Sequence, residues 1–158
     1  MSTHPHSNLF TQVDRTKEPD LFVRFMDEAQ KPAGIQASKR LMLERMALAP
    51  GEAVLEVGCG SGTDVFDMVE LVGPAGRLVG LDASKVMIAE ARRRAKALCV
   101  PITFEVGDVQ TFPFPDGTFD VCRAGRLLEH LPNAERALAE MVRVTRSGGR
   151  ISISTGTR

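Results

Sequence analysis

Residues 54–63 read VLEVGCGSGT, an apolar run that becomes acidic and then rich in glycine. A segment of helical length follows, and then comes the run LVGLD, which ends at Asp82. A buried strand, a tight glycine turn and a helix that begins near Thr63 would direct backbone N–H groups at a ligand. An acid at the end of the next strand is where a ribose diol finds its acceptor. This spacing predicts a cradle for an adenosine-bearing ligand.

Strands and helices alternate along the chain on both sides of this cradle. The expected strands are Ala53–Val57, Arg77–Leu81, Ile102–Val106, Thr118–Arg123 and Arg150–Ser154. The expected helices are Thr63–Val72, a helix capped by Ser84 that runs to Leu98, and Ala134–Val144. A turn is expected at Gly148-Gly149. Strands joined by helices in this way predict a parallel sheet with right-handed crossovers, which is an α/β fold.

The first 50 residues have a different character. Residues 1–18 are polar, and His4 and His6 in this tail are interpreted as ordinary polar residues rather than metal ligands. Helical periodicity predicts a short amphipathic helix over Leu21–Gln30 and a second helix over Ile35–Leu48. We therefore divide the chain into an N-terminal helical segment, 1–50, and a ligand-binding domain, 51–158.

The N-terminal segment has two open interpretations. Four apolar residues of the first helix share one face, and Phe10 precedes them; the four are Leu21, Phe22, Phe25 and Met26. They would either fold over the ligand as a lid or pack as an ordinary helix against the domain.

The amino-acid composition limits the classes of function that this chain can have. With 158 residues the chain forms one domain, and Lys plus Arg (20) equals Asp plus Glu (20). The chain has no Trp or Tyr, so neither a global positive field nor a base-stacking surface favours a nucleic-acid partner. No run of about 18 apolar residues predicts a membrane span, and the N-terminus lacks the pattern of a secretion signal.

The three cysteines are Cys59, Cys99 and Cys122. They are scattered, odd in number and free of Cys-x-x-Cys or Cys/His ligand spacing, so the sequence supports neither a zinc site nor a disulfide framework. Free thiols in a reducing cytoplasm are the expected state.

More than one family of adenosine-binding enzymes uses such a glycine loop, and further motifs distinguish between these families. Glu56 precedes the loop, which gives the pattern E-x-G-x-G-x-G. Residues 106–109 read VGDV at the end of the third strand, while 114–120 (FPDGTFD) and 128–132 (LEHLP) flank the fourth. Residues 50–155 as a whole resemble class I S-adenosylmethionine-dependent methyltransferases of the small-molecule and quinone-biosynthesis type. NAD-dependent oxidoreduction is the weaker alternative, because no hydride-transfer site is evident.

This chain departs from the family pattern at a few positions. Glu56 stands where the family has Asp, Phe112 stands where it has Leu, and residues 146–149 read RSGG in place of KPGG. The changes at Glu56 and Phe112 are mild. The resemblance implies a Rossmann-like, doubly wound parallel sheet with N-terminal helices, the cofactor S-adenosyl-L-methionine and the product S-adenosyl-L-homocysteine. It also implies methyl transfer to a small-molecule acceptor.

The resemblance further implies a set of cofactor-binding residues at the strand ends, namely Glu56, Gly58, Gly60, Gly62, Asp82, Ala83, Met87, Asp108, Val109 and Arg123. The three glycines would pass close to the methionine and sugar groups of the cofactor. Asp82 would accept both ribose hydroxyls, and Met87 would lie against the adenine ring. Asp108 and the Val109 amide would bind the adenine edge, and the Arg123 carbonyl would lie near the methionine ammonium.

Several of these residues also have a purely structural interpretation. Gly62 permits close helix–strand packing, Asp108 is a turn former, Met87 suits a helix core, and Glu56 is a candidate organiser of the loop. His130 is the best candidate for a general base, since the imidazole of histidine ordinarily titrates near neutral pH, although a role in ordering its loop is an alternative.

The sequence ends after the fifth expected strand, whereas the family has seven strands in the order 3-2-1-4-5-7-6. We therefore expect a five-stranded sheet in the order 3-2-1-4-5, with strands 6 and 7 absent. Three explanations remain open: a truncated piece of a longer enzyme, which we favour, a minimal protein completed by a partner, or a cofactor-binding domain without transferase activity. The fifth strand would be an exposed edge, so a homodimer through it or through the N-terminal helices is one expectation.

Overall fold

The computed structural model describes residues 13–155 and confirms the expected five-stranded sheet in the order β3-β2-β1-β4-β5. Every neighbouring pair of strands is parallel. The strands are β1 (Ala53–Val57), β2 (Arg77–Asp82), β3 (Ile102–Val106), β4 (Phe119–Gly125) and β5 (Thr145–Ser154). The α-helices are α2 (Pro19–Ala29), α3 (Ala33–Met46), α4 (Thr63–Phe66), α5 (Val69–Val72), α6 (Lys85–Leu98) and α7 (Ala134–Val144), with short 3-10 helices η1 (Val13–Arg15) and η2 (Leu128–His130). His4, His6 and Phe10 lie outside the described residues.

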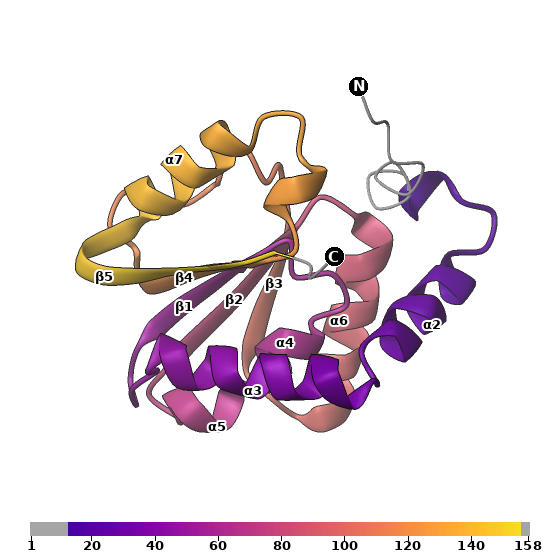
Figure 1. Ribbon diagram of the computed structural model, residues 1–158, viewed down its shortest axis with the longest axis horizontal. Coiled ribbons are helices and arrows are strands. Elements are labelled where there is room, and N and C mark those ends of the chain that lie inside the picture. The colour runs from indigo at the N-terminus through magenta and orange to yellow at the C-terminus, as the bar shows by residue number, and fades with distance from the viewer. Residues whose placement is uncertain (1–12, 156–158) are drawn as a thin grey trace.

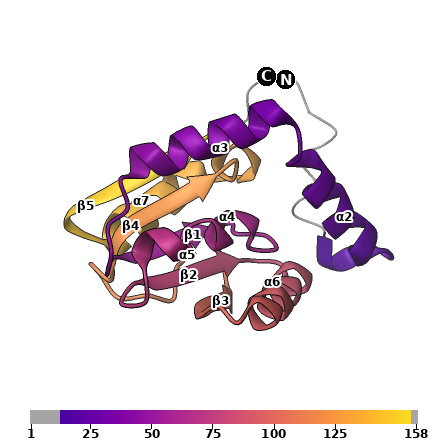
Figure 2. The same cartoon turned by 90° about the horizontal axis from the view of Figure 1, so that it is seen from below.

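Helices cover both faces of the sheet, with α3, α4, α5 and α6 on one side and α7 on the other (Figures 1 and 2). Alternate residues of the strands supply the two cores. Val54 and Val121 join the core beneath α3 to α6, whereas Leu55 and Cys122 join the core beneath α7. Burial on both faces explains why the strand sequences are nearly continuous apolar runs. None of the helices within residues 13–155 is both long and apolar enough to cross a membrane.

All five strands point the same way, so their carboxyl ends meet at one edge of the sheet. Val57 pairs with Leu81, and Asp82 pairs with Val106, which brings the ends of β1, β2 and β3 side by side. Ligands of open α/β sheets bind at this edge. The loops that follow β1, β2, β3 and β4 are therefore the ones that build a site.

The helix expected over Thr63–Val72 is divided in two. The Met68 N–H donates to Val65 O, three residues back, at 3.1 Å, so the chain tightens between α4 and α5. The tightening turns the Met68 side chain fully into the core. Core packing thus overrides a continuous helix at this point.

The turn expected at Gly148-Gly149 is wrong, because both glycines lie within β5. Pairing jumps from Phe119–Thr145 to Val121–Arg150, so this part of β5 is a bulge. A Cβ on Gly149 would lie 2.6 Å from the Asp120 carbonyl oxygen, a clash that only glycine avoids. Close backbone approach, and not a chain reversal, is the reason for glycine at this position.

The amphipathic face expected on α2 is only partly buried. Val23 is the buried residue, and it packs with Val13 and Met87, while Leu21 and Phe25 are 60% and 62% exposed. Helix α2 stands beside α6 at the end of the sheet in both views (Figures 1 and 2). Val23 is the only described residue of this helix that is buried, so Leu21 remains exposed, while the exposed Phe25 borders the cavity described below.

Candidate functional site

A cavity of about 530 Å³ lies where the loops after β1, β2, β3 and β4 meet. Nine of the eleven residues that the sequence singled out line it: Glu56, Gly58, Gly60, Asp82, Ala83, Met87, Asp108, Val109 and His130. Gly62 and Arg123 are not among the described lining residues. The topology thus collects residues from four separate segments around one volume suited to a small molecule.

The glycine loop after β1 is tied to the neighbouring strand. The N–H groups of Gly58 and Cys59 both donate to Leu81 O, at 2.7 and 3.1 Å. Gly62 then begins α4 with a left-handed φ of +84°, and a Cβ there would lie 2.7 Å from the Phe104 ring. Gly62 therefore shapes the loop from behind, by close packing, while Gly58 borders the cavity itself.

Asp82 joins the glycine loop to the start of α6. Its Oδ2 accepts from the Gly60 N–H at 2.8 Å, and its Oδ1 accepts from the Ser84 N–H at 2.9 Å. Burial raises the pKa of this carboxyl, and the two backbone hydrogen bonds act against the rise. Each carboxylate oxygen retains a second lone pair, so Asp82 can accept a pair of hydroxyl groups from a ligand in the cavity.

Asp108 follows β3 and forms a turn. Its Oδ1 accepts from the Gln110 N–H at 2.8 Å, while Val109 is buried against the α7 core. No further hydrogen bond to this carboxylate is made within residues 13–155, which leaves Oδ2 for a donor in the cavity. The turn-forming and ligand-binding interpretations of Asp108 are therefore compatible.

Met87 belongs to both the core and the cavity. It is 4% exposed, packs with Val13 and Val23, and its N–H donates to Ser84 Oγ at 3.2 Å. The N-cap at Ser84 fixes the first turn of α6 and so the place of the Met87 side chain. The structural and ligand-contact interpretations coexist here too.

The wall opposite the glycine loop comes from the N-terminal segment and from the loop after β4. Sequence reasoning did not identify most of these lining residues, among them Val13, Ala29, Gln30, Arg126, Leu127 and Pro132. One signal was present: because β1 and β4 are neighbours, the residues after β4 must face those after β1. Leu127 does so, since a Cβ on Gly58 would lie 2.8 Å from its Cδ1.

His130 ends η2 at this wall and is 25% exposed at its side chain. Its Nε2 lies 3.8 Å from Glu129 Oε1. Both residues line the cavity. An imidazole in this position is able to exchange a proton with a bound molecule and with solvent.

The thiol of Cys59 also lines the cavity, but it is not poised to react. Burial, and then the charges of Asp82 and Glu56, raise the pKa of this thiol well above its usual value. Cys59 therefore remains protonated, and its Sγ contacts Gly60 O at 3.6 Å. The described cysteines are free thiols, and no cluster of metal-ligating side chains occurs within residues 13–155.

Beneath the glycine loop lies a buried network of charges. Arg123 Nη1 donates to Glu56 Oε1 at 2.5 Å, and Arg123 Nη2 donates to Asp64 Oδ2 at 2.9 Å. Lys39 Nζ pairs with the other oxygen of Asp64 at 2.6 Å. The expected position of Arg123 at the strand end is wrong, because β4 continues to Gly125, which is the residue that lines the cavity.

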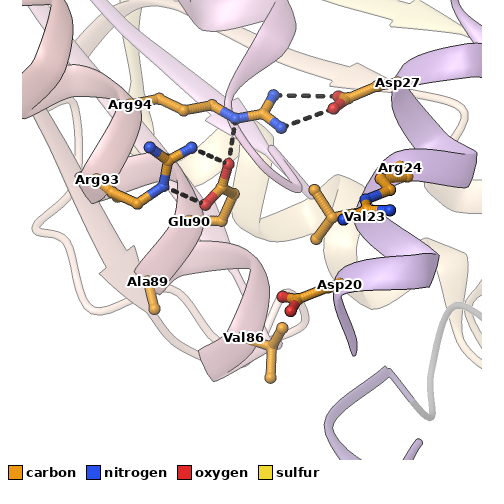
Figure 3. A pocket seen from close by; sticks show the side chains of 9 residues that line it. All are labelled: Asp20, Val23, Arg24, Asp27, Val86, Ala89, Glu90, Arg93 and Arg94. Atoms are coloured by element: carbon orange, nitrogen blue, oxygen red, sulfur yellow. Dashed lines mark hydrogen bonds and ion pairs between the residues drawn. The ribbon is translucent and has the colours of Figure 1, made fainter. Parts of the chain in front are cut away.

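A second hollow, about 610 Å³, lies between α2 and α6 (Figure 3). Four of its charged residues pair with one another: Arg94 Nη2 lies 2.8 Å from Asp27 Oδ2, and both Arg93 and Arg94 donate to Glu90. The lining of this hollow comes from α2 and α6 alone, whereas the smaller cavity is lined by the loops that follow four strands, so we assign the functional site to the smaller cavity.

Comparison with known proteins identifies a family. Residues 54–149 match the model of a methyltransferase domain. The chain is 37% identical over 148 residues to an uncharacterised 37.1 kDa protein in transposon TN4556 of Streptomyces fradiae, covering 94% of this chain and 42% of that protein. It is 34% identical over 117 residues to the 2-phytyl-1,4-naphtoquinone methyltransferase of Synechococcus elongatus, covering 73% of this chain and 50% of the enzyme.

Among solved structures, the [4+2]-cyclase SpnF superposes with a TM-score of 0.71 and 28% identity, covering 79% of this chain and 47% of SpnF. The chain spans about half the length of the curated relatives described above. The matched region contains the glycine loop, Asp82, Asp108 and His130. The family assignment therefore covers the same segments that border the cavity.

Proposed function

The chain belongs to the class I S-adenosylmethionine-dependent methyltransferases, and we propose that it transfers a methyl group from S-adenosylmethionine to a small-molecule acceptor. The observation that carries the proposal is Asp82, a carboxylate at the end of β2 that borders the cavity and is hydrogen-bonded to the glycine loop. This is the position at which a nucleoside ribose is bound in sheets of this kind.

The polar groups of the cavity fit an adenosyl amino acid. Asp82 has lone pairs for a ribose diol, and Asp108 Oδ2 is available to an exocyclic amine. Glu56 lines the cavity, and its Oε2 is buried and accepts no hydrogen bond of normal geometry from residues 13–155. A buried carboxylate oxygen of this kind needs a donor, and the ammonium of a methionine moiety would provide one.

When bound, the cofactor would supply the electrophilic methyl group, and the chain's own residues would orient the acceptor and exclude water. Phe22, Phe25 and Met26 on α2 border the same cavity, so we propose that this segment acts as a lid. His130 would take a proton from an acceptor that must lose one, such as a phenol or an enol.

The first acceptor class to examine is the quinols, since a relative is named as a naphthoquinone methyltransferase. The test is to incubate the full chain with S-adenosylmethionine and a panel of reduced naphthoquinones, phenols and amines, and to measure S-adenosylhomocysteine by chromatography. Acceptor-dependent product that disappears in Asp82→Ala supports the proposal. The proposal would be overturned by a folded chain that binds S-adenosylhomocysteine but forms none from S-adenosylmethionine with any acceptor of the panel.

A second candidate function is cofactor binding without methyl transfer. It is favoured by one observation, that a structural neighbour with 28% identity is named as a cyclase. The panel experiment separates the two candidates, because this second function predicts binding with no turnover.

We also propose self-association through β5. Within the described residues β5 pairs with β4 alone, and apolar side chains are exposed along this margin: Leu138, Val142, Ile151 and Ile153. An unpaired strand edge beside apolar surface favours pairing with a second copy. Sedimentation of the wild type against Ile151→Lys tests this, with a monomeric wild type as the contrary result. The free thiols fit a reducing cytoplasm, which is the location we propose.

A further inference from the structure

Arg123 and Glu56 face each other across two strands. They are Cα partners in the pairing of β4 with β1, and both side chains point to the face covered by α3 and α4. Arg123 is 2% exposed and Glu56 is 3% exposed. A buried pair of opposite charges is costly to form, and removal of one partner leaves the other uncompensated.

The guanidinium of Arg123 contacts side chains from three different elements of the fold. Nη1 donates to Glu56, Nη2 donates to Asp64, and the Met42 sulfur lies 2.9 Å from Nη2 and 3.1 Å from Nε. Gly125 leaves room for it, because a Cβ there would lie 2.8 Å from Nη2. Since Gly125 borders the cavity, the guanidinium lies directly behind the cavity wall.

In this arrangement the two carboxylate oxygens of Glu56 differ in their hydrogen bonding. Oε1 is engaged by Arg123, whereas Oε2 is buried and accepts no hydrogen bond of normal geometry from the described part of the chain, although Glu56 borders the cavity. Burial raises the pKa of Glu56 to about 7, and the charge of Arg123 acts against the rise. Without Arg123, the carboxyl would bind a proton and lose its fixed orientation.

We propose that Arg123 is a positioning residue for the cofactor: it holds the Glu56 carboxylate in the orientation in which Oε2 accepts from the ammonium of the methionine moiety. The inference rests on the proposed function, since it assumes that an adenosyl amino acid occupies the cavity. Arg123 acts through Glu56 and does not itself touch the ligand.

Two ligands isolate this effect. S-adenosylhomocysteine carries the ammonium, whereas 5′-methylthioadenosine shares the nucleoside and the sulfur but lacks the amino acid group. Calorimetric titration of the full chain should show that Arg123→Met weakens binding of the first roughly 10- to 100-fold, the effect of losing a hydrogen bond to a charged group. Binding of the second should change less than about threefold, because its contacts do not depend on Glu56.

A double-mutant cycle tests whether the effect passes through Glu56. In a Glu56→Gln background, Arg123→Met should cause no further change in the ratio of the two affinities. The double variant also removes both buried charges together, so it keeps the experiment informative where the single variant does not fold. Arg123→Lys should give an intermediate ratio, since an ammonium retains the charge but lacks the planar fork that reaches both carboxylates.

The outcomes distinguish this inference from the proposed function. A folded wild-type chain that binds neither ligand contradicts the proposed function. A wild type that binds both, with variants that weaken both equally, contradicts the role of Arg123 alone and indicates general damage to the fold. A further effect of Arg123→Met in the Glu56→Gln background likewise overturns the inference.

Discussion

The carboxylate of Asp82 accepts a hydrogen bond of 2.8 Å from the backbone N–H of Gly60, across the gap between the ends of β2 and β1. The same carboxylate binds the Ser84 N–H, at the cap of α6. One side chain therefore fixes the glycine loop and the start of the next helix relative to each other. Loss of that carboxylate affects both the shape of the cavity and the groups available to a ligand.

Replacement of Asp82 by asparagine should weaken S-adenosylhomocysteine binding roughly 10- to 100-fold, because a neutral amide cannot replace a charged acceptor for both the backbone and the ribose. Titration calorimetry measures the effect. Asp67→Asn is the matched control, since Asp67 is half exposed and does not line the cavity, and it should bind as the wild type does. Equal affinities for Asp82→Asn and the wild type would contradict the assigned site.

Gly62→Ala should destabilise the fold more than Gly51→Ala. The two glycines have nearly the same positive φ, +84° and +87°, so each substitution incurs a left-handed backbone cost of about 1 kcal/mol. At Gly62 the new methyl also meets the Phe104 ring, whereas nothing lies within 4 Å of a Cβ at Gly51. Overpacking adds about 1–3 kcal/mol at Gly62. Denaturant unfolding of the two variants measures the difference. Equal losses in the free energy of unfolding would show that the Phe104 ring moves aside at no energetic cost.

The raised pKa of Glu56, about 7, predicts opposite pH effects on stability and on binding. The folded chain binds this proton more tightly than the unfolded chain. The contribution of Glu56 to stability is therefore complete below its ordinary pKa of 4.5 and is lost as the pH rises through about 7. Binding of an ammonium needs the ionised carboxylate, so affinity for S-adenosylhomocysteine should rise roughly tenfold between about pH 6 and pH 8.

The charged and titratable groups around Glu56 come from several elements. They are Arg123, Asp64 and Lys39 in the ion-pair network, and the thiols of Cys59 and Cys122. Burial raises the pKa of both thiols, so they stay neutral over this range. Glu56→Gln is the control, and a pH profile that persists in this variant would assign the titration to another group.

The contact between α2 and α6 should govern how fast a ligand leaves. Arg94 Nη1 and Nη2 bind Asp27 at 3.1 and 2.8 Å (Figure 3). Arg94 Nη1 also lies 3.3 Å from Ser61 Oγ in the glycine loop. Asp27→Asn should speed dissociation of S-adenosylhomocysteine about two- to fivefold, in keeping with a partly exposed ion pair. Stopped-flow displacement measures the rate.

Glu28→Gln provides the comparison for that rate. It lies on the same helix, but its ion pair with Lys31 is exposed and local to α2 and the residues after it. Dissociation from this variant should match the wild type. If Asp27→Asn and Glu28→Gln give the same rate, α2 does not restrict release of the ligand.

The sequence was most informative where one physical pattern dominated. The strands and the glycine loop that build the cavity follow from apolar runs, glycine turns and an acid at the end of β2, all of which are local in the sequence. The cap at Ser84 was predicted correctly for the same reason, since its side chain bonds three residues ahead, to the Met87 N–H. The strand order was implied instead by the resemblance to the methyltransferase family.

Features that depend on distant contacts escaped prediction. The bulge in β5 exists because Gly149 packs on the Asp120 carbonyl, a contact that no pattern within β5 reveals. The side chain of Arg123 was likewise unforeseen, because its partners Glu56 and Asp64 are 67 and 59 residues away. Phe25 is exposed because it borders the open cavity and does not pack on the sheet, which periodicity alone does not reveal.

The most direct test of the account is a calorimetric titration of the full chain with S-adenosylhomocysteine, and with NAD in parallel. We predict a dissociation constant on the order of 1 µM for the former and no measurable binding of the latter. A chain that unfolds cooperatively, yet binds NAD as tightly as S-adenosylhomocysteine or binds neither, would contradict the assignment of the cavity.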